Sequence, residues 1–301
     1  MRVALEVWSS RFEQVESTCA LAESLGIDAF YYGESPHGLN LDCWTTLAGL
    51  ARTTERIRLG PVITNVLPTY RSLALLAKQA STVASLSDGR LDFRTGVGAA
   101  PAFARSWWEP FGIDYPDYGQ RLADLAEALD KLPLLWAGEP LVRRAEQESR
   151  DRGQADSAVR SIPVTVAARG TRSMRLAAAT ADAWETSFCT ATEFAAQNAQ
   201  MTGLLAGREI VRSLEIDGFV SETPRGVDRL LDRIRTERGP AEDLRPVLER
   251  ALVGVPSDAA GHLVELAGMG VDQVVVALHD PHDPDAVEAL AATAAMLRDG
   301  V

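Results

Sequence analysis

Apolar and polar positions along the chain follow two different periods. Short runs such as VALEVW at 3–8 and VVVAL at 274–278 are mostly apolar and have the length of buried strands. Longer segments between such runs carry their apolar residues on one helical face. The pattern predicts eight strands, at residues 3–8, 30–33, 57–65, 91–97, 164–168, 184–188, 210–220 and 274–278.

Helical patterns occupy the segments between these strands. The predicted helices cover residues 12–25, 41–53, 72–86, 118–136, 173–180, 193–205, 226–250 and 284–297. Eight βα units in 301 residues predict an α/β fold, a single (β/α)₈ TIM barrel that forms one domain over residues 1–301. A doubly wound open sheet is the alternative, but it places a glycine-rich turn after its first strand, where this chain has Trp8-Ser9-Ser10.

One segment departs from the alternation of strands and helices. Residues 139–161 are polar and charged, and they lack an apolar stripe. Such a composition predicts a loop or an insertion in the barrel, and not a linker between two domains.

The acidic balance of the chain limits its partners. The net charge of −12 argues against nucleic acid and against an anionic membrane surface, because both require clustered cations. No apolar run is long enough to span a bilayer and the N-terminus lacks a cleavage signal, so we expect a cytoplasmic protein. Cys19, Cys43 and Cys189 are too few and too widely separated for a disulfide framework or a metal site, and we expect them to be buried.

The stretch LGPVITNVLPTYRS at 59–72 places a polar pair, Thr64-Asn65, where a core strand normally stays apolar. The segments 55–98, 166–187 and 252–278, which contain ERIRLG, LSDGRL and VAARGTRSM, resemble in order the luciferase-like flavin barrel superfamily. That superfamily includes FMN-dependent monooxygenases and coenzyme F420-dependent oxidoreductases. The resemblance covers most of the chain and supports the barrel prediction.

The resemblance implies a cofactor-binding turn after the third strand. It places a non-prolyl cis peptide bond at Asn65–Val66, which would push Val66 against the central ring while Asn65 offers its amide to ring heteroatoms. Thr64, Asn65 and Val66 are therefore candidate cofactor-binding residues. From the residues alone, Asn65 could instead cap the turn before Pro68.

The motif VAARGTRSM at 166–174 combines a strand, a glycine, a hydroxyl and guanidinium groups at a helix start, which suits a phosphate. The candidates are Arg169, Gly170, Thr171 and Ser173, and the resemblance implies that they hold the cofactor's phosphate. The alternative is an ordinary βα turn with Ser173 as the N-cap.

A second glycine turn follows the fourth strand. Gly96 and Gly98 would let the backbone approach the cofactor ring, as the resemblance implies. Ala99 stands where the sugar-phosphate and alcohol dehydrogenases of the F420 branch carry a glutamate, which argues against those substrates. Substrate-binding candidates are Trp8, Trp107 and Trp108. Trp107 and Trp108 could wall a flat apolar pocket, although one of these two could equally pack in the core.

The segment GESPHG at 33–38 follows the second strand. Glu34 and His37 are the catalytic candidates, because histidine exchanges a proton near neutral pH and a neighbouring carboxylate can tune it. Ser35 occupies the position of the family's usual histidine, so the match is loose here, and His37 could simply lie on the rim.

The turn TNVLPTYR at 64–71 most resembles the F420 branch of the superfamily, which implies a coenzyme F420-dependent oxidoreductase that transfers hydride to an unsaturated small-molecule or peptide substrate in secondary metabolism. Lys78 and Lys131 are the only lysines, an arginine bias typical of actinobacterial hosts, where F420 is common. The alternatives are an FMN-dependent monooxygenase using O₂, a non-catalytic partner subunit and a cofactor-free hydrolase. The chain carries no NAD fingerprint, so a separate reductase would supply the reduced cofactor. The resemblance implies a homodimer.

Overall fold

The computed structural model describes residues 1–38, 41–138, 162–239 and 243–299. The segment 139–161, predicted to be an insertion, lies outside these ranges. The strands are β1 (Arg2–Val7), β2 (Ala29–Gly33), β3 (Arg58–Val62), β4 (Phe93–Gly96), β5 (Val164–Ala167), β6 (Ala183–Ser187), β7 (Val211–Val220), β8 (Ala251–Gly254) and β9 (Gln273–Leu278).

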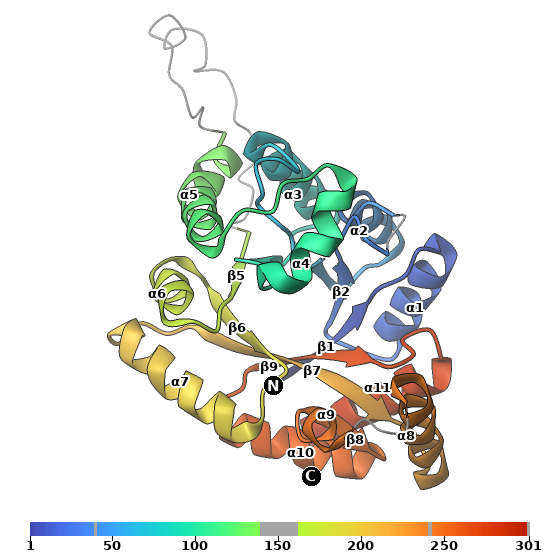
Figure 1. Cartoon of the computed structure of the whole chain (residues 1–301). Helices are drawn as coiled ribbons and strands as arrows, with labels where there is room; N and C mark the ends of the chain where they lie inside the picture. The colour runs from blue at the N-terminus through green and yellow to red at the C-terminus, as the bar shows by residue number, and fades with distance from the viewer. Residues whose placement is uncertain (39–40, 139–161, 240–242, 300–301) are drawn as a thin grey trace, which may run out of the picture.

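All strand pairs within the described ranges are parallel, and the strand order is β3-β2-β1-β9-β7-β6-β5-β4. Two isolated bridges, Leu59 with Leu91 and Thr64 with Thr95, join β3 to β4 and nearly close the barrel. The short β8 pairs with the last residues of β7 outside this ring. The structure therefore confirms the predicted TIM-barrel class (Figure 1).

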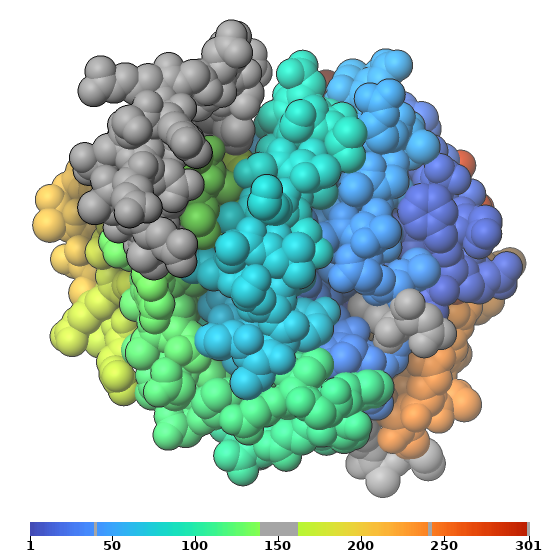
Figure 2. Space-filling view, turned by 90° about the horizontal axis from the view of Figure 1, so that it is seen from above, coloured from blue at the N-terminus to red at the C-terminus, as the bar shows by residue number. Residues whose placement is uncertain are grey.

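Helices alternate with the strands and surround them (Figure 1). They are α1 (Phe12–Ser24), α2 (Cys43–Thr53), α3 (Leu73–Leu86), α4 (Pro101–Trp108), the short 3₁₀ helix η1 (Glu109–Phe111), α5 (Tyr118–Trp136), α6 (Thr171–Thr180), α7 (Ala191–Leu205), α8 (Pro224–Arg238), α9 (Arg245–Leu248), α10 (Pro256–Gly268) and α11 (Pro284–Asp299). Seen from above, α2, α3 and α5 pack side by side on one flank (Figure 2). None of the described helices is long and apolar enough to cross a lipid bilayer.

Local sequence signals explain why several helices begin where they do. Asp42 accepts the backbone N–H of Thr45 at 2.8 Å and starts α2. Ser72 caps α3 in the same way through Leu75. Thr190 and Glu193 form a reciprocal capping box at the start of α7.

The strands bury apolar residues on their outer face against the helices. Along β1, Val3, Leu5 and Val7 belong to this outer core, whereas Ala4 points into the barrel. Such strands, covered on both faces, read as the nearly continuous apolar runs that predicted them.

The inside of the barrel is unusually polar. Arg58 pairs with Asp92 at 2.6 Å, and the Tyr31 hydroxyl donates to Asp92 at 2.8 Å. Above them the guanidinium of Arg94 lies 3.9 Å from the centre of the Tyr31 ring and pairs with Glu185 at 2.5 Å. This network fills the barrel from its lower end up to the floor of a cavity at the carboxyl ends of the strands.

The element prediction misses several features. The predicted helix 226–250 is two helices, α8 and α9, and no element was predicted for the strand β8 at 251–254 or the helix α10 at 256–268 that follow it. No element was predicted at 101–108 either, where α4 forms. β8 and α4 are short, with four and eight residues, so pattern alone does not identify them.

Candidate active site

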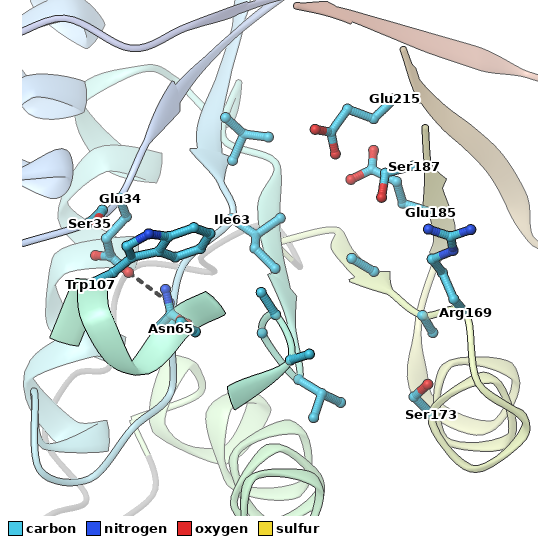
Figure 3. A pocket seen from close by; sticks show the side chains of 18 of the residues that line it. Glu34, Ser35, Ile63, Asn65, Trp107, Arg169, Ser173, Glu185, Ser187 and Glu215 are labelled. Carbon is cyan, nitrogen blue, oxygen red and sulfur yellow. Dashed lines mark hydrogen bonds between the residues drawn. The ribbon is translucent and has the colours of Figure 1, made fainter. Parts of the chain in front are cut away.

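A cavity of about 790 Å³ opens at the carboxyl ends of the barrel strands. Residues from β1, β3, β5, β6 and β7, from the loops that follow β1 to β5 and from α4 contribute to its walls. Its position is the one expected for the active site of a barrel. Figure 3 shows Ile63 across the cavity from Arg169 and Ser173, with Trp107 on the side of Glu34 and Asn65.

The β3 wall differs in detail from the prediction. β3 ends at Val62, and the non-prolyl cis peptide bond lies at Val62–Ile63 and not at Asn65–Val66. The chain rejoins β4 at Thr64, whose N–H donates to the Arg94 carbonyl at 2.8 Å. Ile63 lines the cavity together with Val62 and Asn65, and the predicted position of the cis bond is wrong by three residues.

Gly96 and Gly98 serve this wall in different ways. Gly96 does not line the cavity, but a Cβ there would lie 2.8 Å from Ile63 Cδ1, so the glycine makes room for that side chain. Gly98 lines the cavity with a φ of +81°, and a Cβ there would lie 2.4 Å from the hydroxyl oxygen of Tyr115. Both positions therefore require the absence of a side chain.

The three predicted residues after β3 separate in space. Asn65 lines the cavity. The fully buried Thr64 donates its hydroxyl to Glu34 at 2.9 Å and lies behind the wall. Val66 packs against the outer core and lines a smaller hollow next to α3.

Glu34 lies in the cavity wall with both carboxylate oxygens occupied. Arg71 donates to them at 2.9 and 3.1 Å, and the backbone N–H of Asn65 donates at 2.7 Å. The other catalytic candidate, His37, is exposed at the rim of the same cavity. The structure thus brings both candidates to one cavity, one as a buried ion pair and the other on the surface.

The phosphate candidates meet at the start of α6. Gly170 is the N-cap and provides no side chain for capping, so the interpretation of Ser173 as the N-cap is wrong. Arg169, Gly170 and Ser173 line the cavity, and Arg169 is exposed. Thr171 points elsewhere and accepts a hydrogen bond from Gln200 at 2.9 Å.

The three tryptophans have different environments. Trp8 and Trp107 line the cavity with 45% and 39% of their surface exposed. Trp108 is only 3% exposed and packs against Tyr70 and Tyr115, with ring centres 5.1 and 6.4 Å apart. Trp108 thus lines the cavity, as predicted, and it also packs in the core, which was the alternative prediction.

Three glutamates lie on the cavity floor, and none of them is among the predicted site residues. Glu6 of β1, Glu185 of β6 and Glu215 of β7 line the cavity from inside the barrel. Burial raises the pKa of Glu6 to about 7. Burial and the negative charges of Glu6 and Glu185 hold the pKa of Glu215 well above its usual range. The sequence signal that could have found them is an acidic residue between apolar residues at an inward-facing position of a strand, such as Glu6 in VALEVW.

The comparisons with known proteins agree with this architecture. Residues 4–216 match the luciferase-like monooxygenase family, and the chain belongs to that family. An F420-dependent glucose-6-phosphate dehydrogenase of Beutenbergia cavernae is 31% identical over 176 residues, which cover 54% of this chain and 48% of the relative. The chain thus spans about half the length of the curated relatives it matches.

Solved structures resemble the chain over nearly its whole length. An F420-dependent secondary alcohol dehydrogenase in complex with an F420-acetone adduct has a TM-score of 0.75 at 13% identity, covering 97% of this chain and 99% of that one. The oxygenating constituent of 3,6-diketocamphane monooxygenase of Pseudomonas putida, in complex with FMN, has a TM-score of 0.77 at 17% identity, covering 100% and 99%. At 13% and 17% sequence identity, the structural similarity shows the fold alone. The related proteins are oxidoreductases and monooxygenases of both cofactor types.

Proposed function

We propose that this protein is a coenzyme F420-dependent oxidoreductase that transfers hydride between the cofactor and an unsaturated small-molecule or peptide substrate. The observation that carries the proposal is the arrangement of the cavity. An apolar wall at Ile63 faces the start of α6 with Arg169 across about 790 Å³ of space. Curated relatives that use F420 support the choice of this cofactor.

The apolar wall suits a flat ring system. Ile63, Val97 and Ala99 line one part of the cavity, and Gly98 keeps the backbone accessible there. Flat apolar surface with a few polar groups is the usual composition of a cofactor pocket. Asn65 lies beside this surface and supplies an amide to polar atoms at the ring edge.

The start of α6 suits the anionic tail of the cofactor. The first N–H groups of a helix have no partner within the helix, and Gly170 supplies no side chain to cap them. They add to the partial positive charge of the helix terminus, and the Arg169 guanidinium adds a full charge. The Ser173 hydroxyl, which donates to the Gly170 carbonyl at 2.9 Å, lies within the same lining.

When bound, the reduced deazaflavin would supply a hydride. The chain's own residues would hold the ring at Ile63, exclude water with Trp107 and Trp8, and hold a proton for the substrate. His37 at the rim and Glu34 in the wall remain the predicted proton-handling residues. A separate reductase would regenerate the reduced cofactor.

An FMN-dependent monooxygenase is the second candidate function. A pyrimidine monooxygenase of Serratia proteamaculans is 35% identical over 99 residues, which cover 32% of this chain and 25% of the relative. The same helix terminus would accept the phosphate of FMN, so the phosphate site by itself does not distinguish the two cofactors.

Binding titrations followed by turnover assays test the proposal. F420 and FMN are each titrated with the protein while their fluorescence is recorded, and each reduced cofactor is then assayed with and without O₂. We expect saturable F420 binding that is tighter than FMN binding, and cofactor oxidation that needs an acceptor substrate and not O₂. Tighter FMN binding with O₂ consumption would establish the monooxygenase instead, and saturable binding of neither cofactor would overturn both.

A further inference from the structure

Three carboxyl groups from distant parts of the chain meet on the cavity floor. They belong to Glu6, Glu185 and Glu215, on strands β1, β6 and β7. Figure 3 shows the carboxyl groups of Glu185 and Glu215 pointing into the same corner of the cavity. An acidic residue at one such inward position would be unremarkable, but three around one space concentrate negative charge under the substrate region.

The cation nearest to these glutamates is already engaged. Arg94 of β4 is fully buried, pairs with Glu185 at 2.5 Å, and has its face covered by the Tyr31 ring. It does not line the cavity. Ser213 also donates to Glu185, at 2.7 Å, so the charge of Glu185 is balanced from below. Among the described residues Glu6 and Glu215 form no ion pair, and the charge of Arg94 acts on them only from beyond ion-pair distance.

Two carboxylate oxygens on the floor lack an N–H or hydroxyl donor among the described residues. Glu6 is 6% exposed, and no such donor reaches its Oε2, although the Trp8 indole N–H donates to Oε1 at 2.5 Å and the carboxyl of Glu215 shares a hydrogen bond with Glu6 when one of the two is protonated. Oε1 of the fully buried Glu185 is likewise without a donor among the described residues. Buried acceptors without donors are costly, and both of these residues line the cavity. They are groups that a ligand with N–H donors would satisfy.

We propose that the floor of the cavity binds the cationic nitrogen of the substrate, a protonated amine, an amidine or an iminium, between Glu6 and Glu215. The substrate class rests on the proposed function, whereas the binding of the cation does not require the cofactor. The ligand's N–H groups would donate to Oε2 of Glu6 and to Glu215, as charge-assisted hydrogen bonds in a site largely closed to water. The Trp8 ring beside Glu6 would cover the cation from the rim.

The groups around the floor give this binding a distinct pH signature. Tyr31, Arg94 and Glu185 lie below the pair, and His37 and Arg169 lie at the rim of the same cavity. Burial and the charge of Glu185 raise the pKa of Glu6 to about 7, and burial with the charges of Glu6 and Glu185 holds the pKa of Glu215 well above its usual range, so the empty pair holds a proton at neutral pH. A bound cation replaces that proton, and binding is then accompanied by proton release.

Calorimetry with a cationic probe and its neutral counterpart tests the proposal. Benzylamine, which stays protonated between pH 6 and pH 8, and benzyl alcohol are titrated into the protein without cofactor. We expect benzylamine to bind more tightly than benzyl alcohol. Its affinity should rise about tenfold from pH 6 to pH 8, because the Glu6 carboxyl, with a pKa of about 7, loses its proton over this range. The heat should depend on the ionisation enthalpy of the buffer because protons leave the site.

Two variants complete the test. Glu6→Gln should remove both the preference for the amine and the proton release, whereas Glu55→Gln, at an exposed site before β3, should change neither. Equal binding of amine and alcohol, no amine binding in the millimolar range, or Glu6→Gln binding like the parent would overturn the proposal. The parent and both variants are also titrated with F420. If the parent binds the amine but not F420, only the proposed cofactor is refuted. If it binds F420 but not the amine, only the proposed cation site is refuted.

Discussion

The carboxylate of Glu34 and the guanidinium of Arg71 meet at 2.9 Å, with side chains that are 1% and 5% exposed. The same guanidinium reaches the Thr64 hydroxyl at 3.0 Å and the Asn65 carbonyl at 3.2 Å. One buried ion pair therefore holds the whole chain segment that leaves β3 and forms the cavity wall. The ion pair therefore explains why the polar residues Thr64 and Asn65, and then Arg71, follow a strand of the barrel core.

Removing one partner of this pair should be strongly destabilising. Arg71→Ala leaves a buried carboxylate without its cation, and we expect a loss of about 3–5 kcal/mol in the free energy of unfolding. Urea unfolding measures the effect, with the exposed Arg52→Ala on α2 as the control, expected within about 0.5 kcal/mol of the parent. A loss for Arg71→Ala no larger than the control's would contradict this role.

The contact of Gly98 with Tyr115 makes a second prediction. Gly98→Ala places a methyl group 2.4 Å from the Tyr115 hydroxyl oxygen at a φ of +81°, and we expect weaker cofactor binding and a lower melting temperature. Tyr115→Phe removes that oxygen, at the expense of its hydrogen bond to the Ala99 carbonyl at 2.8 Å. In a double-mutant cycle the second change should recover the steric part of the loss. Strictly additive losses would show that the two residues do not interact in this way.

The start of α6 predicts a charge-dependent loss of binding. Arg169→Ala should weaken F420 binding about tenfold or more, because a charge-assisted hydrogen bond contributes about 1.5–3 kcal/mol. A deazaflavin analogue that lacks the phosphate should bind both proteins equally. The matched control is Arg175→Ala, an exposed arginine on the same helix that does not line the cavity. Equal losses for the intact cofactor and the analogue would remove the phosphate from this position.

The floor glutamates predict how stability depends on pH. An acid whose pKa is raised on folding, from 4.5 to about 7 for Glu6, binds a proton more tightly in the folded protein. Its contribution to stability is therefore present below pH 4.5 and is lost as the pH rises toward 7. Glu6→Gln cannot lose this contribution, so relative to the parent it should gain up to about 3 kcal/mol between pH 4.5 and pH 8. Denaturant titrations at several pH values measure this difference, and a pH-independent difference between the two proteins would contradict the raised pKa.

Much of the architecture follows from the sequence because the barrel strands are covered on both faces. Runs such as VALEVW and VVVAL are apolar for that reason, and they predict β1 and β9 well. Strand β8 does not follow, because Ala251–Gly254 is short and continues directly from a charged helical segment. The end of β3 also escapes prediction, because ITN after Val62 reads as more strand although the chain leaves the sheet at Ile63.

Some residues of the candidate site could likewise be predicted from the sequence, and others could not. Residues that directly follow a strand, such as Asn65, Gly98 and Arg169, are found at the cavity because barrel topology alone places them there. Thr64 and Thr171 are adjacent in sequence to lining residues but point away. Thr64 does so because successive side chains of an extended segment face opposite sides, and Thr171 because its hydroxyl faces Gln200 of α7. The floor glutamates could not be assembled from the sequence, because their proximity depends on the register between strands that are far apart in the chain.

A crystal structure with F420 bound would show where the cofactor lies in the cavity. We expect the deazaflavin ring against Ile63 and Gly98, and the phosphate within hydrogen-bonding distance of Arg169, Ser173 and the first N–H groups of α6. A ring bound away from the β3 wall, or a tail that leaves the start of α6 without a ligand, would contradict this expectation.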